Sequence, residues 1–85
     1  MSADRRMVRD AYRAAMRREG QARTTILKRS AELGWWLDHV GERWATATRH
    51  DVDDWLDGRT LAASTRYVAI SNLHAFYMWA RREEH

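Results

Sequence analysis

The sequence contains no cysteine and no proline, and only four of its 85 residues are glycine. Without cysteine, the chain forms no disulfide and no thiolate metal site, and the composition suits a reducing compartment. Proline and glycine, the residues that interrupt helices, are absent or rare, and this favours helices joined by short turns. No apolar run approaches the roughly 20 residues of a membrane span, and residues 1–18 lack the apolar centre of a signal peptide. We therefore expect one small cytoplasmic domain with no membrane partner.

Charge is distributed unevenly along the chain. Residues 1–30 carry nine Lys or Arg against three Asp or Glu, whereas residues 31–63 carry three against seven. All but one of the 15 cations are arginine, which forms paired hydrogen bonds with phosphates and base edges. This asymmetry indicates one face for a polyanion and another for solvent or a protein, although charge at this level is also common on small helical domains.

Apolar residues recur at helical spacing in four segments, at about residues 4–19, 23–40, 49–57 and 63–82. The pattern predicts an all-α fold, a four-helix bundle in a single domain. The first segment is a basic amphipathic helix, a type that can bind membranes or calmodulin-like partners, but its small alanine-rich face favours packing against sister helices. The predicted core contains Val8, Tyr12, Met16, Ile26, Leu33, Trp36, Leu37, Val52, Trp55, Leu56, Ile70, Leu73, Phe76 and Tyr77.

Local signals mark where these helices begin and where they approach one another. Thr24 or Thr25 is expected to cap the second helix. Thr48 and Asp51 have the spacing of a capping box, which predicts the start of the third helix. Gly34 lies in the middle of the second helix, where glycine is unfavourable, and it indicates a close approach by another helix.

Five tryptophans invite a base-stacking hypothesis. Trp36 and Trp55 lie on apolar stripes and are expected in the core instead. Trp44, in the connection after the second helix, is expected to cover the edge of the core. Trp79 is offset from the apolar stripe of the last helix, so we expect it at the bundle edge or at a domain interface. For Trp35 the sequence does not decide between a buried and an exposed position.

Metal and catalytic sites are not indicated. No two histidines have the i,i+4 spacing on one helix that metal ligands need. Among the acidic residues of the third helix, Asp51 has a capping position and the others are expected on the solvent-exposed face, so they do not indicate a catalytic pocket. We expect no metal, no cofactor, no small-molecule ligand and no catalysis. The residues considered were His39, His50, His74, His85, Asp51, Asp53, Asp54 and Asp57.

An ordered set of short motifs across residues 5–82 resembles the N-terminal core-binding domain of tyrosine recombinases, the phage-integrase family. Each motif alone is weak, and the order of the set is what makes the resemblance specific. The motifs are Thr25 with Leu33 and Trp36, Thr48-Arg49-His50-Asp51-Val52 with Trp55-Leu56, Leu61 with Ser64-Thr65, and Ile70 and Leu73 with Phe76-Tyr77 and Trp79-Ala80.

The resemblance implies a SAM-like four-helix bundle that forms half of a clamp around a recombination site. It also implies that the second and fourth helices lie against the major groove and the DNA backbone. The expected function is DNA binding in site-specific integration, with double-stranded DNA and other recombinase protomers as partners and a place at the nucleoid of a prokaryotic or phage-infected cell. The implied DNA-binding residues are Arg23, Thr24, Thr25, Lys28, Arg29, Ser64, Thr65, Arg66, Val68 and Asn72.

This chain departs from the family pattern in three ways. Ala62 stands where serine is frequent, so the fourth helix is expected to be poorly capped. Val68 stands where the family commonly has a polar residue. Its side chain forms no hydrogen bond with a base, so it can recognise a base only by apolar contact with the methyl group of thymine. The catalytic domain of the family is missing, and Tyr12, Tyr67 and Tyr77 lie in bundle helices, so we expect a non-catalytic fragment of a longer integrase.

A second interpretation stays open. A helical domain with an acidic flank can serve recombinase assembly without touching DNA. In that case the contact surface would be the acidic third helix together with an exposed Trp79.

Overall fold

The computed structural model describes residues 5–83 and contains four α-helices and one 3-10 helix in that range. This confirms the predicted all-α, four-helix class. The first helix is slightly shorter than the expected 4–19, and residue 4 lies outside the described range. None of the described helices combines the length and the apolar character needed to cross a membrane. The elements are α1 (Arg5–Arg18), α2 (Arg23–Val40), η1 (Gly41–Thr46), α3 (Arg49–Asp57) and α4 (Ala63–Arg82).

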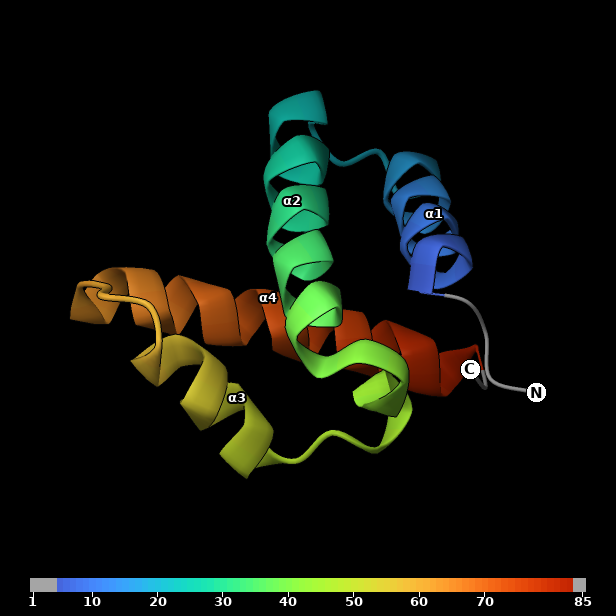
Figure 1. Cartoon of the computed structure of the whole chain (residues 1–85). Coiled ribbons are helices and arrows are strands. Elements are labelled where there is room, and N and C mark those ends of the chain that lie inside the picture. Colours follow the sequence, from blue (N-terminus) through green and yellow to red (C-terminus); the bar gives the residue numbers. More distant parts are fainter. Residues whose placement is uncertain (1–4, 84–85) are drawn as a thin grey trace.

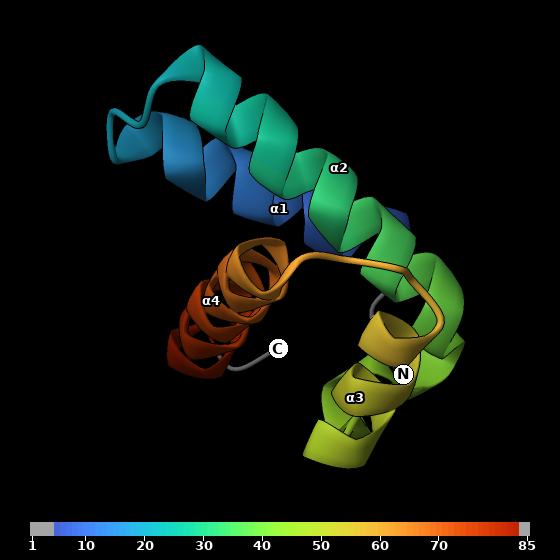
Figure 2. The same cartoon turned by 90° about the vertical axis from the view of Figure 1, so that its left-hand side faces the viewer.

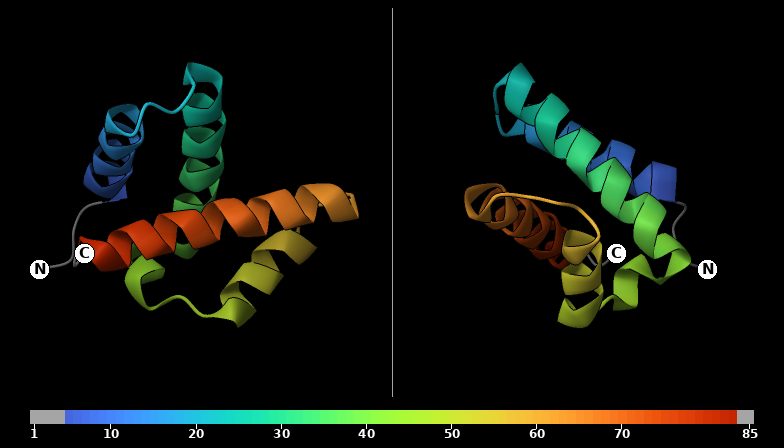
Figure 3. Two further views of the ribbon diagram at one scale, coloured as in Figure 1. Left: turned by 180° about the vertical axis from the view of Figure 1, so that it is seen from behind. Right: turned by 60° about the vertical axis from the view of Figure 1, so that its left-hand side comes forward.

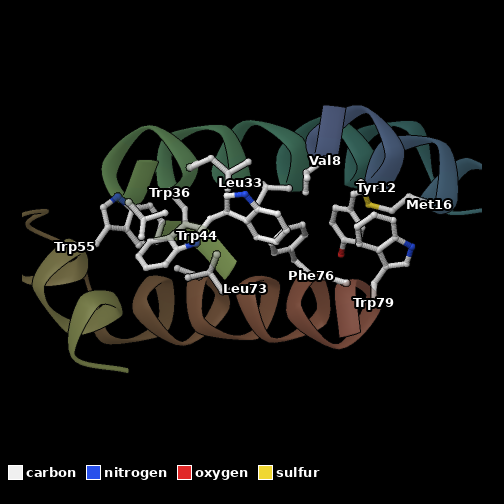
Figure 4. Close-up of a cluster of buried hydrophobic side chains, with 14 of the residues drawn as sticks. Val8, Tyr12, Met16, Leu33, Trp36, Trp44, Trp55, Leu73, Phe76 and Trp79 are labelled. Carbon is white, nitrogen blue, oxygen red and sulfur yellow. The ribbon is translucent and has the colours of Figure 1, made fainter. Parts of the chain in front are cut away.

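The helices form two layers. α1 and α2 run antiparallel as one layer, and α4 crosses that pair with α3 beside its first half (Figure 1). The side view in Figure 2 separates the α1–α2 pair from α3 and α4. The view from behind in Figure 3 shows that α2 and α4 cross, so their first turns point away from the crossing in different directions. The core lies between the layers (Figure 4).

Aromatic side chains fill most of this core. Trp36 and Phe76 are fully buried. The Tyr12 ring meets Phe76 edge-on, with centroids 5.3 Å apart, and Trp55 lies against Trp36 at 5.4 Å. Trp44 is also buried, because the connection after α2 winds into η1 and turns this side chain inward. The core placement predicted for Trp36 and Trp55 is therefore confirmed.

Two predictions for α4 are wrong. Trp79 was expected at an edge or interface, but it is only 5% exposed, because α1 covers it and places the Tyr12 ring 5.1 Å away. Ile70 was expected in the core, but it is 42% exposed. Ala69 and Leu73 take the inward positions of this part of α4, which leaves Ile70 on the flank toward α3.

The helix caps agree with the sequence in α3 and differ in α2. The Asp51 backbone N–H donates to Thr48 Oγ1 at 3.4 Å, and the Thr48 N–H donates to Asp51 Oδ2 at 2.8 Å, which completes the predicted capping box. α2 begins after Ala22 with no side-chain cap. The predicted threonine cap is wrong, because Thr24 and Thr25 already lie inside the first turn.

Candidate nucleic-acid interface

The residues proposed to bind DNA lie in the first half of α2 and the first half of α4. The middle of α4 crosses the later part of α2, so the start of α2 and the start of α4 lie far apart (Figure 1). The structure does not bring the two helix starts together. It instead forms a corner between one flank of α2 and one flank of α4.

The α4 side of this corner carries Thr65, Val68 and Asn72. Their spacing of three and then four residues places them on one flank of the helix. Thr65 and Val68 are exposed and Asn72 is half-buried. The same row continues to Ala75, which lines a groove together with Arg29 of α2. The row on α4 and Arg29 therefore lie on the same side of the molecule.

Arg66 does not belong to that row. It lies two residues before Val68 and hence on the opposite flank of α4. Its Nη2 is 3.3 Å from Oδ1 of Asp57, at the end of α3. Arg66 thus faces α3 with its charge balanced, whereas Ser64 is exposed in the first turn of α4.

The α2 side of the corner mixes cations, one acid and an exposed ring. Thr25, Lys28, Glu32 and Trp35 share one flank by helical spacing. Glu32 Oε1 accepts a hydrogen bond of 3.1 Å from Arg59, which comes from the loop between α3 and α4. The Arg59 guanidinium also stacks over the rings of Trp35 and Trp55, at 5.3 and 4.7 Å from their centroids.

Sequence reasoning missed Arg59, because no helical pattern places this loop residue against α2. Trp35, which the sequence left open, is 56% exposed at this corner. The Arg59 side chain neutralises Glu32, so the α2 flank presents no unpaired acid to a ligand at this point.

Arg29 and Arg23 take different surroundings within α2. Arg29 is half-buried, donates to Gln21 Oε1 at 3.3 Å and lies near Tyr12. Burial raises the pKa of the Tyr12 phenol, and the nearby Arg29 charge partly opposes this rise. Arg23 is exposed and lines a surface hollow with Arg13 and Arg17 of α1, which sequence analysis had not assigned to a site. Thr24, beside Arg23, is also exposed.

Positive charge is left uncompensated where α1 meets the start of α2. Arg13, Arg17, Arg23 and Lys28 lie there, and within residues 5–83 none of them forms an ion pair with a carboxylate. Cations without an ion pair also occur elsewhere in the described part of the chain, among them Arg49 in α3 and Arg81 and Arg82 at the end of α4. The paired arginines are Arg5 with Asp38 and Glu42, Arg43 with Asp51, Arg59 with Glu32, and Arg66 with Asp57.

The histidines take isolated positions. His39 stacks against Trp36, and His50 Nε2 lies 3.5 Å from Asp54 Oδ2. No group of three or more His, Asp or Glu side chains with metal-binding geometry occurs in the described part of the chain. His85 lies outside that part.

A comparison with protein families gives one match. Residues 31–84, more than half of the chain, match the phage integrase N-terminal SAM-like domain. No curated protein and no solved structure shows significant similarity to the chain. The matched range contains all five α4 residues proposed to bind DNA, whereas those on α2 precede it.

Proposed function

The chain belongs to the family of phage integrase N-terminal SAM-like domains, and from this we propose that it is the DNA-binding module of a tyrosine recombinase. In this role it grips a recombination half-site and positions a catalytic domain, since the small domain alone is non-catalytic in integrases. The observation that carries the proposal is the uncompensated cationic end of α2 beside the exposed corner between α2 and α4.

The corner offers the contact types that a duplex needs. Lys28 on α2 supplies positive charge for phosphates, and Thr25 and Thr65 supply hydroxyl groups. Asn72 offers an amide of the kind that pairs with adenine, and Val68 offers a methyl surface for thymine. Arg66 is left out of this set, because it lies on the other flank of α4 and pairs with Asp57 there.

We expect the isolated domain to bind duplex DNA weakly. A few phosphate contacts give a Kd of roughly 10⁻⁴–10⁻⁶ M at physiological salt, with affinity falling steeply as salt rises. The test is a titration of a fluorescein-labelled duplex, read by anisotropy at several salt concentrations. Lys28→Ala should weaken binding to all sequences and reduce the salt slope by about one.

Arg43→Ala is the matched control for this titration. It also removes one positive charge, but Arg43 lies in η1 and is paired with Asp51, so DNA affinity should be nearly unchanged. Absence of binding by the wild-type protein at low salt would refute the proposal. So would amide shifts confined to α3 in an NMR titration with the same duplex.

A role in assembly is the second candidate, and one observation favours it. Val52, Ile70, Leu73 and Tyr77 line an apolar groove between α3 and α4. The neighbouring Tyr67 is 72% exposed. Trp79 no longer supports this role, because it is buried. Sedimentation at increasing concentration tests the idea: dimerisation without any response to DNA would favour a protein contact over a DNA contact.

A further inference from the structure

Four arginines follow one another at every fourth position of α1: Arg5, Arg9, Arg13 and Arg17. This spacing places them along one side of the helix, and their contacts show that this side faces α2. Arg5 Nη1 donates to the Leu37 carbonyl oxygen at 3.2 Å. Arg9 Nη1 lies 2.7 Å from the position that a Cβ on Gly34 would take. We call this row the arginine ladder.

The charge of the arginine ladder is balanced only at its beginning. Arg5 lies 3.7 Å from an Asp38 oxygen and 3.6 Å from a Glu42 oxygen. Within residues 5–83, no carboxylate pairs with Arg9, Arg13 or Arg17. Uncompensated charge therefore increases along the seam toward the α1–α2 turn.

The end of the arginine ladder opens into a hollow of about 460 Å³. Arg13 and Arg17 line it from α1, and Arg23 lines it from the first turn of α2. Ile26 and the 49% exposed Leu27 form its apolar wall, and the Gln21 side chain completes the lining. Three cations thus share one concave surface.

A residue that lines this surface also has an unused hydrogen-bond donor. The buried Nε atom of Arg13 has no hydrogen-bond partner among the described residues. Like charges four residues apart repel one another on a helix, and a buried donor without a partner is unfavourable. A ligand rich in anionic oxygens would relieve both conditions, because guanidinium groups bind phosphate through paired hydrogen bonds.

We propose that Arg13, Arg17 and Arg23 form a binding site for phosphate groups of the DNA backbone, separate from the corner between α2 and α4. This inference rests on the proposed DNA-binding function. Arg23 and Lys28 project from different sides of the first turns of α2, so this end of α2 lies between the hollow and the corner. A duplex seated in the corner would therefore pass the hollow with its backbone.

The first test compares two double variants with equal loss of charge. Arg13→Ala with Arg17→Ala should reduce affinity for a labelled duplex at least tenfold at low salt. It should also make the salt slope shallower by about one to two, as expected for the loss of one or two phosphate contacts. Arg43→Ala with Arg49→Ala removes the same charge from the η1–α3 side and should change affinity less than threefold. Equal losses in both variants would overturn the site.

The second test separates the site from the proposed function. Inorganic phosphate, compared with chloride at equal ionic strength, should raise the Tm of the wild-type protein, because a ligand that binds only the folded state stabilises it. The same addition should have no effect on the double variant. Arg17→Ala alone, at an exposed position, repeats the comparison if the double variant does not fold.

The outcomes are distinct. A phosphate response without duplex binding would refute the proposed function and leave the anion site standing. Duplex binding whose salt slope is unchanged both in the Arg13→Ala, Arg17→Ala double variant and in Arg17→Ala alone would refute the site and leave the function standing. Self-association that these substitutions abolish, with no phosphate response, would assign the hollow to an acidic protein segment instead and overturn the inference.

Discussion

Trp36 Nε1 donates a hydrogen bond of 2.9 Å to the hydroxyl of Tyr77. That hydroxyl in turn donates to the carbonyl oxygen of Trp44 at 2.7 Å, so one oxygen joins α2, α4 and η1. Tyr77→Phe removes the oxygen and leaves a buried indole N–H without its partner. We expect the free energy of unfolding to fall by about 1–3 kcal/mol, measured by urea denaturation. Tyr67→Phe, at a 72% exposed position, is the control. Equal stability of the two variants would contradict the role of this hydrogen bond.

The same phenol makes stability sensitive to alkaline pH. Burial raises the pKa of Tyr77, and burial also raises the pKa of Tyr12. In the unfolded chain both phenols ionise near pH 10, so above that pH the folded state holds more protons than the unfolded state. The stabilisation is complete below about pH 10 and is lost as the pH rises through the folded pKa values. Urea denaturation between pH 8 and 11.5 should show this decline, and Tyr77→Phe should make it shallower. A parallel decline in both proteins would exclude Tyr77 as its source.

Much of this fold can be read from the sequence, because helical periodicity and the Thr48–Asp51 capping box are local signals. The misassigned residues lie at the margins of an apolar stripe. Ile70 and Trp79 occupy opposite flanks of α4, and which flank is covered depends on where α1 packs. Local periodicity does not contain that information.

The candidate site was less predictable for the same reason. Helical spacing places Arg66 and Val68 on opposite flanks of α4, but only the packing of α3 shows that Asp57 pairs with Arg66. Arg59 and Glu32 meet across 27 residues of chain. The spacing of the arginine ladder is visible in the sequence, but only the packing of α1 on α2 shows that it lines a seam.

The capping box predicts a destabilisation at acidic pH. The hydrogen bond from the Thr48 backbone N–H holds the pKa of Asp51 below its usual value. A lowered folded pKa contributes stability that is present above the unfolded value near 3.9 and is lost as the pH falls through the folded value. Asp51→Asn should therefore flatten the pH dependence of unfolding between pH 5 and 2. An unaltered acid profile in this variant would contradict the assignment.

Thr48→Ala tests the other half of the capping box. It removes the hydroxyl that accepts from the Asp51 backbone N–H, and loss of such a cap costs about 1 kcal/mol. Thermal unfolding followed by circular dichroism measures the change. Thr60→Ala, an exposed threonine outside the helices, should have little effect. Equal losses for the two variants would mean that the cap contributes nothing specific.

Arg59 should contribute more to stability than a surface ion pair. It combines a 3.1 Å contact to Glu32 with stacking on two indole rings, and its side chain is 26% exposed. Arg59→Ala should lower the free energy of unfolding by about 1–2 kcal/mol and change tryptophan emission, because Trp35 loses its cover. Arg43→Ala breaks a more exposed pair and should cost less than about 1 kcal/mol. If Arg43→Ala is the more damaging change, the Arg59 contacts are energetically neutral.

Gly34 and Gly20 should respond to alanine in opposite directions. Gly34 lies within α2, where glycine costs about 1 kcal/mol relative to alanine. The added methyl would meet only the end of the flexible Arg9 side chain, which has no ion pair in the described part of the chain and can rotate away. Gly34→Ala should therefore raise the free energy of unfolding by somewhat less than that amount.

Gly20 has open space around it but a φ of +76°, a left-handed conformation that costs alanine about 1–2 kcal/mol. Urea denaturation measures both changes. A loss of stability in Gly34→Ala would mean that the Arg9 side chain cannot move away from the space beside Gly34 without a cost in free energy.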